Sequence, residues 1–153
     1  MESIGKMKIS CTAGFRVMSD EEIEKLNASE KPQLCLKDDE KHIIVTFGCK
    51  EVNGFASMIL NEKDLAKQTE KKLRKPFEAF GYRFDSFVSQ NVAGQKAEGY
   101  LYDYDVQDTE MSGKTLCLKR DRIFYYIYAY FRRAGKEESL KAFDGLLETA
   151  VWD

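Results

Sequence analysis

The sequence has few of the residues and spacings from which catalytic and metal sites are usually built. It contains one histidine, His42, and its four cysteines include no Cys-x-x-Cys pair, the spacing that zinc sites and dithiol exchange use. No Gly-x-Ser-x-Gly nucleophile motif occurs, and the segment Gly94–Gly99 matches no phosphate-binding loop. We therefore expect no metal, no cofactor and no enzymatic activity.

Long apolar runs and extreme composition are also missing. No stretch of about 18 apolar residues occurs, and residues 1–8 lack the apolar core of about 7 to 15 residues that a secretory signal needs. Two prolines and ten glycines exclude a collagen-like or wholly disordered chain. These absences predict a cytoplasmic protein without membrane insertion.

What is present fits one compact domain over residues 1–153. Hydrophobic residues make up 43% of the chain and aromatic residues 12%, which is enough for a sizeable core. Twenty-four basic against 26 acidic residues give a net charge of -2, which disfavours nucleic acid and anionic lipid as partners. We therefore expect the partner to be a protein or a small ligand, and the sequence does not predict the oligomeric state.

The cysteines are expected to be free and buried. Cys11, Cys35, Cys49 and Cys117 each lie in an apolar or strand-like stretch, where a reduced thiol behaves as a small hydrophobic side chain.

Helical patterns occur in three segments. Ser19 and Glu22 fit a capping box that opens a short helix. The longest helix is predicted from Asn61 to about Phe80, with Pro76 bending it or separating its last turn. A closing helix is predicted over residues 136–151. One stripe of the longest helix carries Leu65, Thr69, Leu73, Phe77 and Phe80.

Strand patterns occupy most of the remaining chain. The β-branched and aromatic segments with alternating polarity are residues 7–11, 34–37, 42–49, 55–60, 83–91, 96–106, 111–120 and 123–131. The last four are close enough in sequence to form an antiparallel meander.

Two tight bends, Asp108-Thr109 and Asp121-Arg122, would fix the register of that meander. One face then carries Leu101, Leu116 and Ile127 in a row. The other face carries three rows in which a small residue lies between two tyrosines, namely Tyr100, Cys117, Tyr126, then Tyr102, Thr115, Tyr128, then Tyr104, Gly113, Tyr130. Because neither face alternates with charges, we expect helices on both sides of the sheet and hence an α+β fold of the α/β/α sandwich type.

The tyrosine face has two interpretations. Its rings form a second core layer with hydroxyls reaching the edge, or part of the layer stays uncovered and binds a partner peptide or small ligand. The candidate binding residues are Tyr100, Tyr102, Tyr104, Tyr126, Tyr128 and Tyr130.

Other polar groups have simple structural interpretations. His42 beside acidic residues matches no ligand spacing, and Asp103 and Asp105 would face Lys114 and Ser112 as ordinary cross-strand pairs. The basic helix segment 63–75 is interspersed with acids and is expected to be a solvated face. Exposed aromatic residues among basic ones, which RNA stacking requires, are not expected.

The order of these elements resembles the PsbP-like superfamily, whose α/β/α fold is shared by a photosystem II subunit and by Ran-binding proteins of the Mog type. The resemblance spans roughly Ile9 to Trp152 and is carried by Gly14-Phe15-Arg16-Val17, by Gly99-Tyr100 and Tyr125-Tyr126 within the meander, and by Leu140, Phe143 and Leu147. It implies a binding or accessory role with no shared catalytic residue. We therefore expect a non-enzymatic accessory or protein-interaction module, the alternative being a small-ligand carrier with a tyrosine-lined pocket between sheet and helix.

Overall fold

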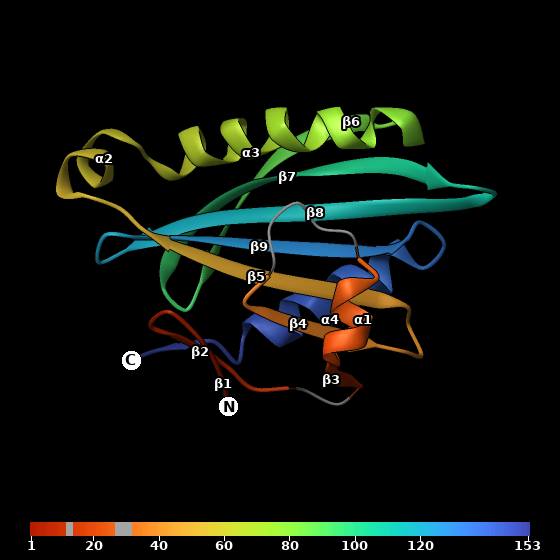
Figure 1. Ribbon diagram of the computed structural model, residues 1–153, viewed down its shortest axis with the longest axis horizontal. Helices are drawn as coiled ribbons and strands as arrows, with labels where there is room; N and C mark the ends of the chain where they lie inside the picture. The colour runs from red at the N-terminus through yellow and green to blue at the C-terminus, as the bar shows by residue number, and fades with distance from the viewer. Residues whose placement is uncertain (12–13, 27–31) are drawn as a thin grey trace.

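The computed structural model describes residues 1–11, 14–26 and 32–153. Its main feature is a seven-stranded antiparallel sheet (Figure 1) in which every neighbouring pair is antiparallel. In spatial order its strands are β3 (Phe15–Val17), β4 (Leu34–Asp38), β5 (Ile43–Glu51), β9 (Ile123–Arg132), β8 (Thr109–Arg120), β7 (Gln95–Val106) and β6 (Arg83–Val92).

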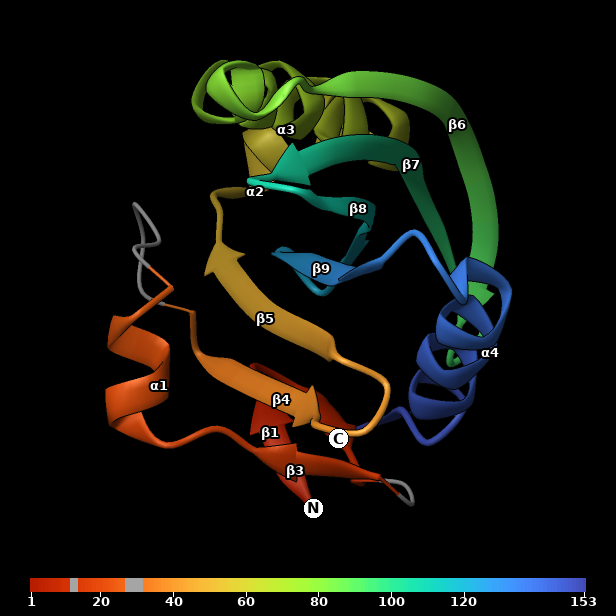
Figure 2. The same ribbon diagram turned by 90° about the vertical axis from the view of Figure 1, so that its right-hand side faces the viewer.

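Helices and a small second sheet surround this layer. The helices are α1 (Asp20–Glu24), α2 (Gly54–Ile59), α3 (Glu62–Phe77) with a 3-10 turn η1 (Glu78–Phe80), and α4 (Lys136–Leu147). The small sheet contains β1 (Glu2–Ile4), β2 (Met7–Ile9) and β10 (Val151–Trp152). Figure 2 shows α1 and α3 on one side of the main sheet and α4 on the other. The predicted α/β/α sandwich is therefore confirmed.

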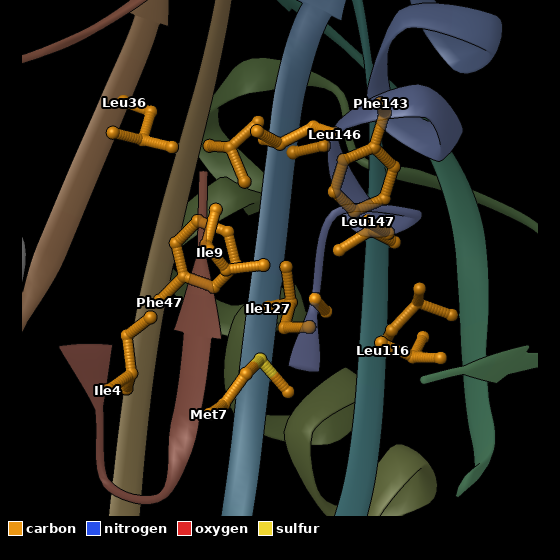
Figure 3. Close-up of a cluster of buried hydrophobic side chains, with 14 of the residues drawn as sticks. Ile4, Met7, Ile9, Leu36, Phe47, Leu116, Ile127, Phe143, Leu146 and Leu147 are labelled. Atoms are coloured by element: carbon orange, nitrogen blue, oxygen red, sulfur yellow. The ribbon is translucent and has the colours of Figure 1, made fainter. Parts of the chain in front are cut away.

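The largest core cluster lies between the main sheet and the layer of α4 and the small sheet. In Figure 3, Phe143 and Leu147 of α4 and Met7 of β2 point toward Ile127 and Leu116. All five side chains are almost completely removed from solvent. Burial of these apolar surfaces closes the sandwich on this side.

The helix starts follow their capping residues. The side chains of Ser19 and Asn61 accept hydrogen bonds from the backbone N–H groups of Glu22 and Asp64, and both capping boxes are complete. The predicted separation of the last turn of the longest helix is confirmed, because the α-helix stops at Phe77, next to Pro76, and residues 78–80 form a 3-10 turn. The starts of both helices could be predicted from their capping residues.

The segment 55–60 is helical, so the predicted strand there is wrong. Asn53 accepts a hydrogen bond at 2.8 Å from the N–H of Ala56 and so caps α2. The Nζ of Lys119 donates to the carbonyls of Ser57 and Leu60 at 2.6 and 2.9 Å. An N-cap and a cation at the last carbonyls both favour a helix over an extended strand.

The two ends of the chain also differ from prediction. The strand predicted over residues 7–11 ends at Ile9 and belongs to the small sheet. The closing helix ends at Leu147, and Val151 lies in β10, paired with Lys8 of β2. The backbone N–H of Asp153 then donates to the carbonyl of Lys6 at 2.8 Å. Pairing with the N-terminal strand overrides the helical spacing of this segment.

One of the two predicted bends is displaced. Arg120 pairs with Ile123, which confirms the Asp121-Arg122 bend, but Val106 pairs with Thr109, so the other bend is Gln107-Asp108. Gln107 adopts φ 55°, the left-handed conformation that such a tight bend needs. Moving the bend by one position shifts the pairing of β7 and β8 by two, and an even shift leaves every side chain on its predicted face.

The cross-strand pairs of Asp103 and Asp105 are consequently wrong. Asp103 lies opposite Ser112, whose hydroxyl donates to its carboxylate at 2.5 Å, and Asp105 lies opposite Glu110. Arg133 binds the carboxylates of Asp103, Asp105 and Glu110 at 3.5, 3.4 and 2.6 Å. The guanidinium of Arg133 therefore offsets part of the negative charge of three acids at this end of the sheet, and Arg83 also binds Asp105 at 3.0 Å.

All four cysteines are free, as predicted, but not all are buried. Cys35 and Cys117 are buried in the sheet, Cys49 is half-buried, and Cys11 is exposed. Cys11 follows the end of β2, where the pattern of the strand no longer determines its burial.

We predict that Gly113→Ala destabilises the fold by roughly 1–3 kcal/mol, the usual cost of overpacking. A Cβ on Gly113 would lie 2.2 Å from Cζ of Tyr102, whereas a Cβ on Gly145 in α4 meets no atom of the described residues within 4 Å. Gly145→Ala is the matched control and should stabilise by about 0.5–1 kcal/mol because it removes a helical glycine. Urea unfolding of both variants measures this, and equal effects of the two would contradict the packing described.

Candidate functional site

The register of the sheet brings the predicted tyrosines to one face. The three rows predicted across the sheet are wrong, because the pairing of β7 with β8 differs from the prediction by two positions. Thr115 lies between Tyr100 and Tyr128, and Gly113 lies between Tyr102 and Tyr130. Cys117 instead lies between Glu98 and Tyr126, and Met111 lies between Tyr104 and Arg132. Alternation along each strand still places all six tyrosines on the side of the sheet that α3 covers. They are Tyr100, Tyr102, Tyr104, Tyr126, Tyr128 and Tyr130.

The helix buries the β7 side of this tyrosine face more completely than the β9 side. The three rings of β7 are buried, whereas those of β9 are only partly buried. Phe77 of α3 packs with its ring centroid 4.8 Å from that of Tyr104 and 5.8 Å from that of Tyr102. Aromatic rings thus fill the space between α3 and β7. The binding role predicted for the six tyrosines stays a prediction.

One hydroxyl group of the tyrosine face is buried without compensation. Among the described residues, the hydroxyl of Tyr102 has no hydrogen-bond partner. Burial raises the pKa of Tyr100 and Tyr102 above the ordinary tyrosine value and raises the pKa of Tyr130 to about 12. A buried phenol resists ionisation because the apolar surroundings disfavour the charged form.

The side of α3 that faces β6 contains a buried carboxylate. Glu70 is 4% exposed, and its oxygens accept hydrogen bonds from the guanidinium of Arg74 and from the hydroxyl of Tyr82, the latter at 2.8 Å. Burial alone would raise the pKa of Glu70, but these hydrogen bonds hold it below the ordinary value. The carboxylate of Glu70 thereby holds the side chains of Arg74 and Tyr82 in place.

Next to this cluster, β6 presents two exposed phenylalanine rings. A bulge at Asp85 lets Phe84 pair with Tyr102 and Phe87 with Tyr100, so both rings lie on the tyrosine face. Their centroids are 4.9 Å apart, and they are 41% and 51% exposed. The extra residue, Asp85, is bound by Lys136 of α4 at 3.8 Å and so points to the other face. The bulge therefore concentrates aromatic surface on one side and removes a carboxylate from it.

The phenylalanine pair forms one wall of a groove along α3, which we call the α3–β6 groove. It consists of two adjoining hollows of about 510 and 340 Å³. Its lining residues are Lys67, Glu70, Lys71, Arg74, Lys75, Glu78, Gly81, Tyr82, Phe84 and Phe87. Four cations thus stand against two carboxylates, one of which, Glu70, is already bound by Arg74. The groove combines apolar ring surface with an excess of positive charge.

Sequence reasoning missed this groove. It expected no exposed aromatic residues among basic ones, and Phe84 and Phe87 contradict that expectation. The three-residue spacing of the two rings would place them on opposite faces of a regular strand. Phe84 and Phe87 nevertheless lie three positions apart in a predicted strand that follows a lysine-rich helix. From this spacing a bulge, and with it a shared face for the two rings, could have been predicted.

The fold is similar to the folds of several solved structures. No protein-family model and no curated protein matches the chain. The structure is similar to cyanobacterial PsbP (CyanoP) from Synechocystis, with a TM-score of 0.67 and 9% identity over 97% of this chain and 87% of that one. It is also similar to the Ran-binding protein Mog1p of Saccharomyces cerevisiae, with a TM-score of 0.58 and 6% identity over 97% and 90%. The chain has a PsbP/Mog1-like fold.

A third solved structure of the PsbP/Mog1-like fold is LpqN of Mycobacterium tuberculosis, described as involved in cell envelope biogenesis. It matches with a TM-score of 0.62 and 9% identity over 95% of this chain and 82% of that one. Identities this low establish the fold alone. Function must therefore be argued from the surface of this chain.

The remaining sequence candidates are not among the residues that line the groove. His42 lies in the exposed turn between β4 and β5 with φ 58°. Asp103 and Asp105 belong to the charge cluster around Arg133. In the described part of the chain, no helix is both long and apolar enough to cross a membrane.

Two tyrosine hydroxyls allow a direct test of this geometry. We predict that Tyr82→Phe destabilises the protein by about 1–3 kcal/mol, because buried Glu70 loses a donor. Tyr102→Phe should leave stability unchanged or raise it by up to about 1 kcal/mol, because its hydroxyl is unsatisfied among the described residues. Chemical unfolding of both variants provides the measurement, and the reverse order would refute the assigned contacts.

The raised pKa values predict a loss of stability at alkaline pH. Because the folded-state pKa of Tyr130, about 12, lies above the unfolded value of about 10, the contribution is complete below pH 10 and disappears as pH rises through 12. Tyr100, Tyr102 and Tyr104 shift in the same direction through burial. Absorbance of tyrosinate, followed with circular dichroism, should show these phenols ionising only as the fold is lost. Ionisation of all eight tyrosines near pH 10 in an intact fold would contradict this.

Proposed function

We propose that this protein is a non-enzymatic interaction module that binds an acidic segment of a partner protein in the α3–β6 groove. The observation that carries the proposal is the exposed Phe84–Phe87 pair beside the cations of α3. Exposed aromatic surface that is rimmed by charge is typical of protein-binding sites.

The positive charge of the groove favours an acidic partner segment. Lys67, Lys71 and Lys75 are exposed, and no carboxylate among the described residues forms an ion pair with them within 4.0 Å. Carboxylates of a partner would find cations here, and an apolar side chain between them would cover the phenylalanine rings. Phosphates would also be attracted, but the net charge of the chain is -2, which opposes the approach of a nucleic-acid strand.

The fold is compatible with this role. One of the similar solved structures is titled a Ran-binding protein, so a PsbP/Mog1-like domain can serve as a partner-binding scaffold. Its partner is not transferred to this chain at 6% identity. The support comes from the groove, and the comparison adds only that the scaffold suits such a function.

Selection from a random peptide library displayed on phage tests the proposal. Peptides that bind the wild-type protein should be enriched in aspartate and glutamate around a large apolar residue. Lys67→Glu/Lys71→Glu should weaken binding of the selected peptides by about tenfold or more, equivalent to about 1.4 kcal/mol. The matched control, Lys63→Glu/Lys72→Glu, makes the same charge change on α3 outside the groove lining. It should change affinity by less than about threefold.

Two outcomes would contradict the proposal. One is the absence of acidic sequences among the enriched peptides, and the other is an equal loss of affinity in both double variants. Preference for an oligothymidylate strand over every peptide would instead assign the groove to nucleic acid. The unfolding midpoints of both variants are measured alongside, so that a folding defect is recognised.

A further inference from the structure

Strand β6 ends the main sheet, and its outer edge is long. It spans ten residues, whereas β3 at the opposite edge spans three. Among the described residues no strand pairs with the outer side of β6. Its backbone N–H and C=O groups on that side are therefore available to a further strand.

The features that normally protect an edge are confined to one end of β6. The bulge and the two charged residues, Arg83 and Asp85, all lie within its first three positions. From Ser86 to Gln95 there is no charged residue and no proline, although charged residues make up 33% of the chain. Sheets that avoid edge pairing place lysine, proline or a bulge along the edge. The unprotected part of β6 lies beside the Phe87 end of the α3–β6 groove.

The alternation along β6 defines what an added strand would present to the groove. Phe87 and Ser89 pair with Tyr100 and Glu98 on the α3 side. Gln90 points to the other side, where it contacts Lys114 at 2.5 Å and Asp144 at 3.4 Å. In a strand beside β6, every second side chain would therefore lie over the groove.

We propose that the partner segment binds by strand addition, extending the main sheet along the outer edge of β6. This inference rests on the proposed function and specifies its binding mode. Main-chain hydrogen bonds to β6 supply affinity, and every second side chain of the segment contacts the groove and determines specificity. The recognised pattern is an acidic residue, any residue, a large apolar residue, any residue and a second acidic residue. The apolar side chain covers Phe84 and Phe87, and the carboxylates face Lys67 and Lys71.

A synthetic peptide with the sequence Asp-Thr-Glu-Val-Phe-Val-Glu-Thr-Asp is the probe, about nine residues long to match an edge strand. Two derivatives carry N-methyl groups on alternate amides, one on the acidic and phenylalanine positions and the other on the threonine and valine positions. Only one set of amides can point toward β6. We expect one derivative to bind at least about tenfold more weakly and the other to bind within about threefold of the unmodified peptide, measured by fluorescence polarisation.

Hydrogen exchange provides a second readout. Addition of the unmodified peptide should slow exchange of amides between Ser86 and Val92 of β6, because new interstrand bonds protect them. Exchange of the amides of α4 should not change.

The outcomes separate the two proposals. Strand addition is overturned if the unmodified peptide binds tightly and both N-methylated derivatives bind equally well. It is also overturned if the peptide binds without slowing exchange of the β6 amides. In either case the groove remains the binding site. No binding by the unmodified peptide, when library-selected acidic peptides also fail, overturns the proposed function with it. A peptide-free dimer whose β6 amides are already protected would assign the edge to a second copy of this chain and overturn the inference.

Discussion

The architecture depends on the packing of large rings over small residues on one face of the sheet. Tyr102 lies over Gly113, and a Cβ at that glycine would overlap the ring. Because the ring lies flat over β8, Phe77 of α3 can approach to within 5.8 Å of its centroid. Together with the packing of Leu65, Ala66 and Leu73 against the sheet, this contact positions α3 and hence its lysines relative to strand β6.

The same packing explains why the groove lies where it does. Helix α3 covers β7 and β8 but does not cover the outer strand, so the rings of Phe84 and Phe87 lie beside the helix and stay exposed. The internal contact of Glu70 with Arg74 and Tyr82 holds the helix surface rigid next to them. Arg74 and Tyr82 are thus ordered before a partner binds, so these two side chains lose little entropy on binding.

Much of the architecture could be predicted from local patterns. The capping residues Ser19 and Asn61, the alternation of the meander and the Asp121-Arg122 bend follow rules that act within a few residues. The face of each tyrosine was also predictable, because a bend displaced by one position changes the register by an even number. The strand expected at residues 55–60 failed because the cap at Asn53 and the contact of Lys119 outweigh the apolar pattern.

The candidate site was less accessible from sequence, since it depends on a bulge and on the position of a helix in space. Phe84 and Phe87 share a face only because Asp85 is left out of the ladder. The extent to which α3 covers the tyrosines, which buries Tyr100 and leaves Tyr128 partly exposed, is likewise a tertiary property.

The most direct measurement of the central claim is the map of amide chemical-shift changes when the acidic peptide is titrated into the labelled protein. The account predicts that the changes cluster on α3 between Lys67 and Lys75 and on β6 around Phe84 and Phe87. A map centred on Tyr126, Tyr128 and Tyr130 of β9 would contradict it. So would a map centred on α2, where Phe55, Met58 and Ile59 are exposed.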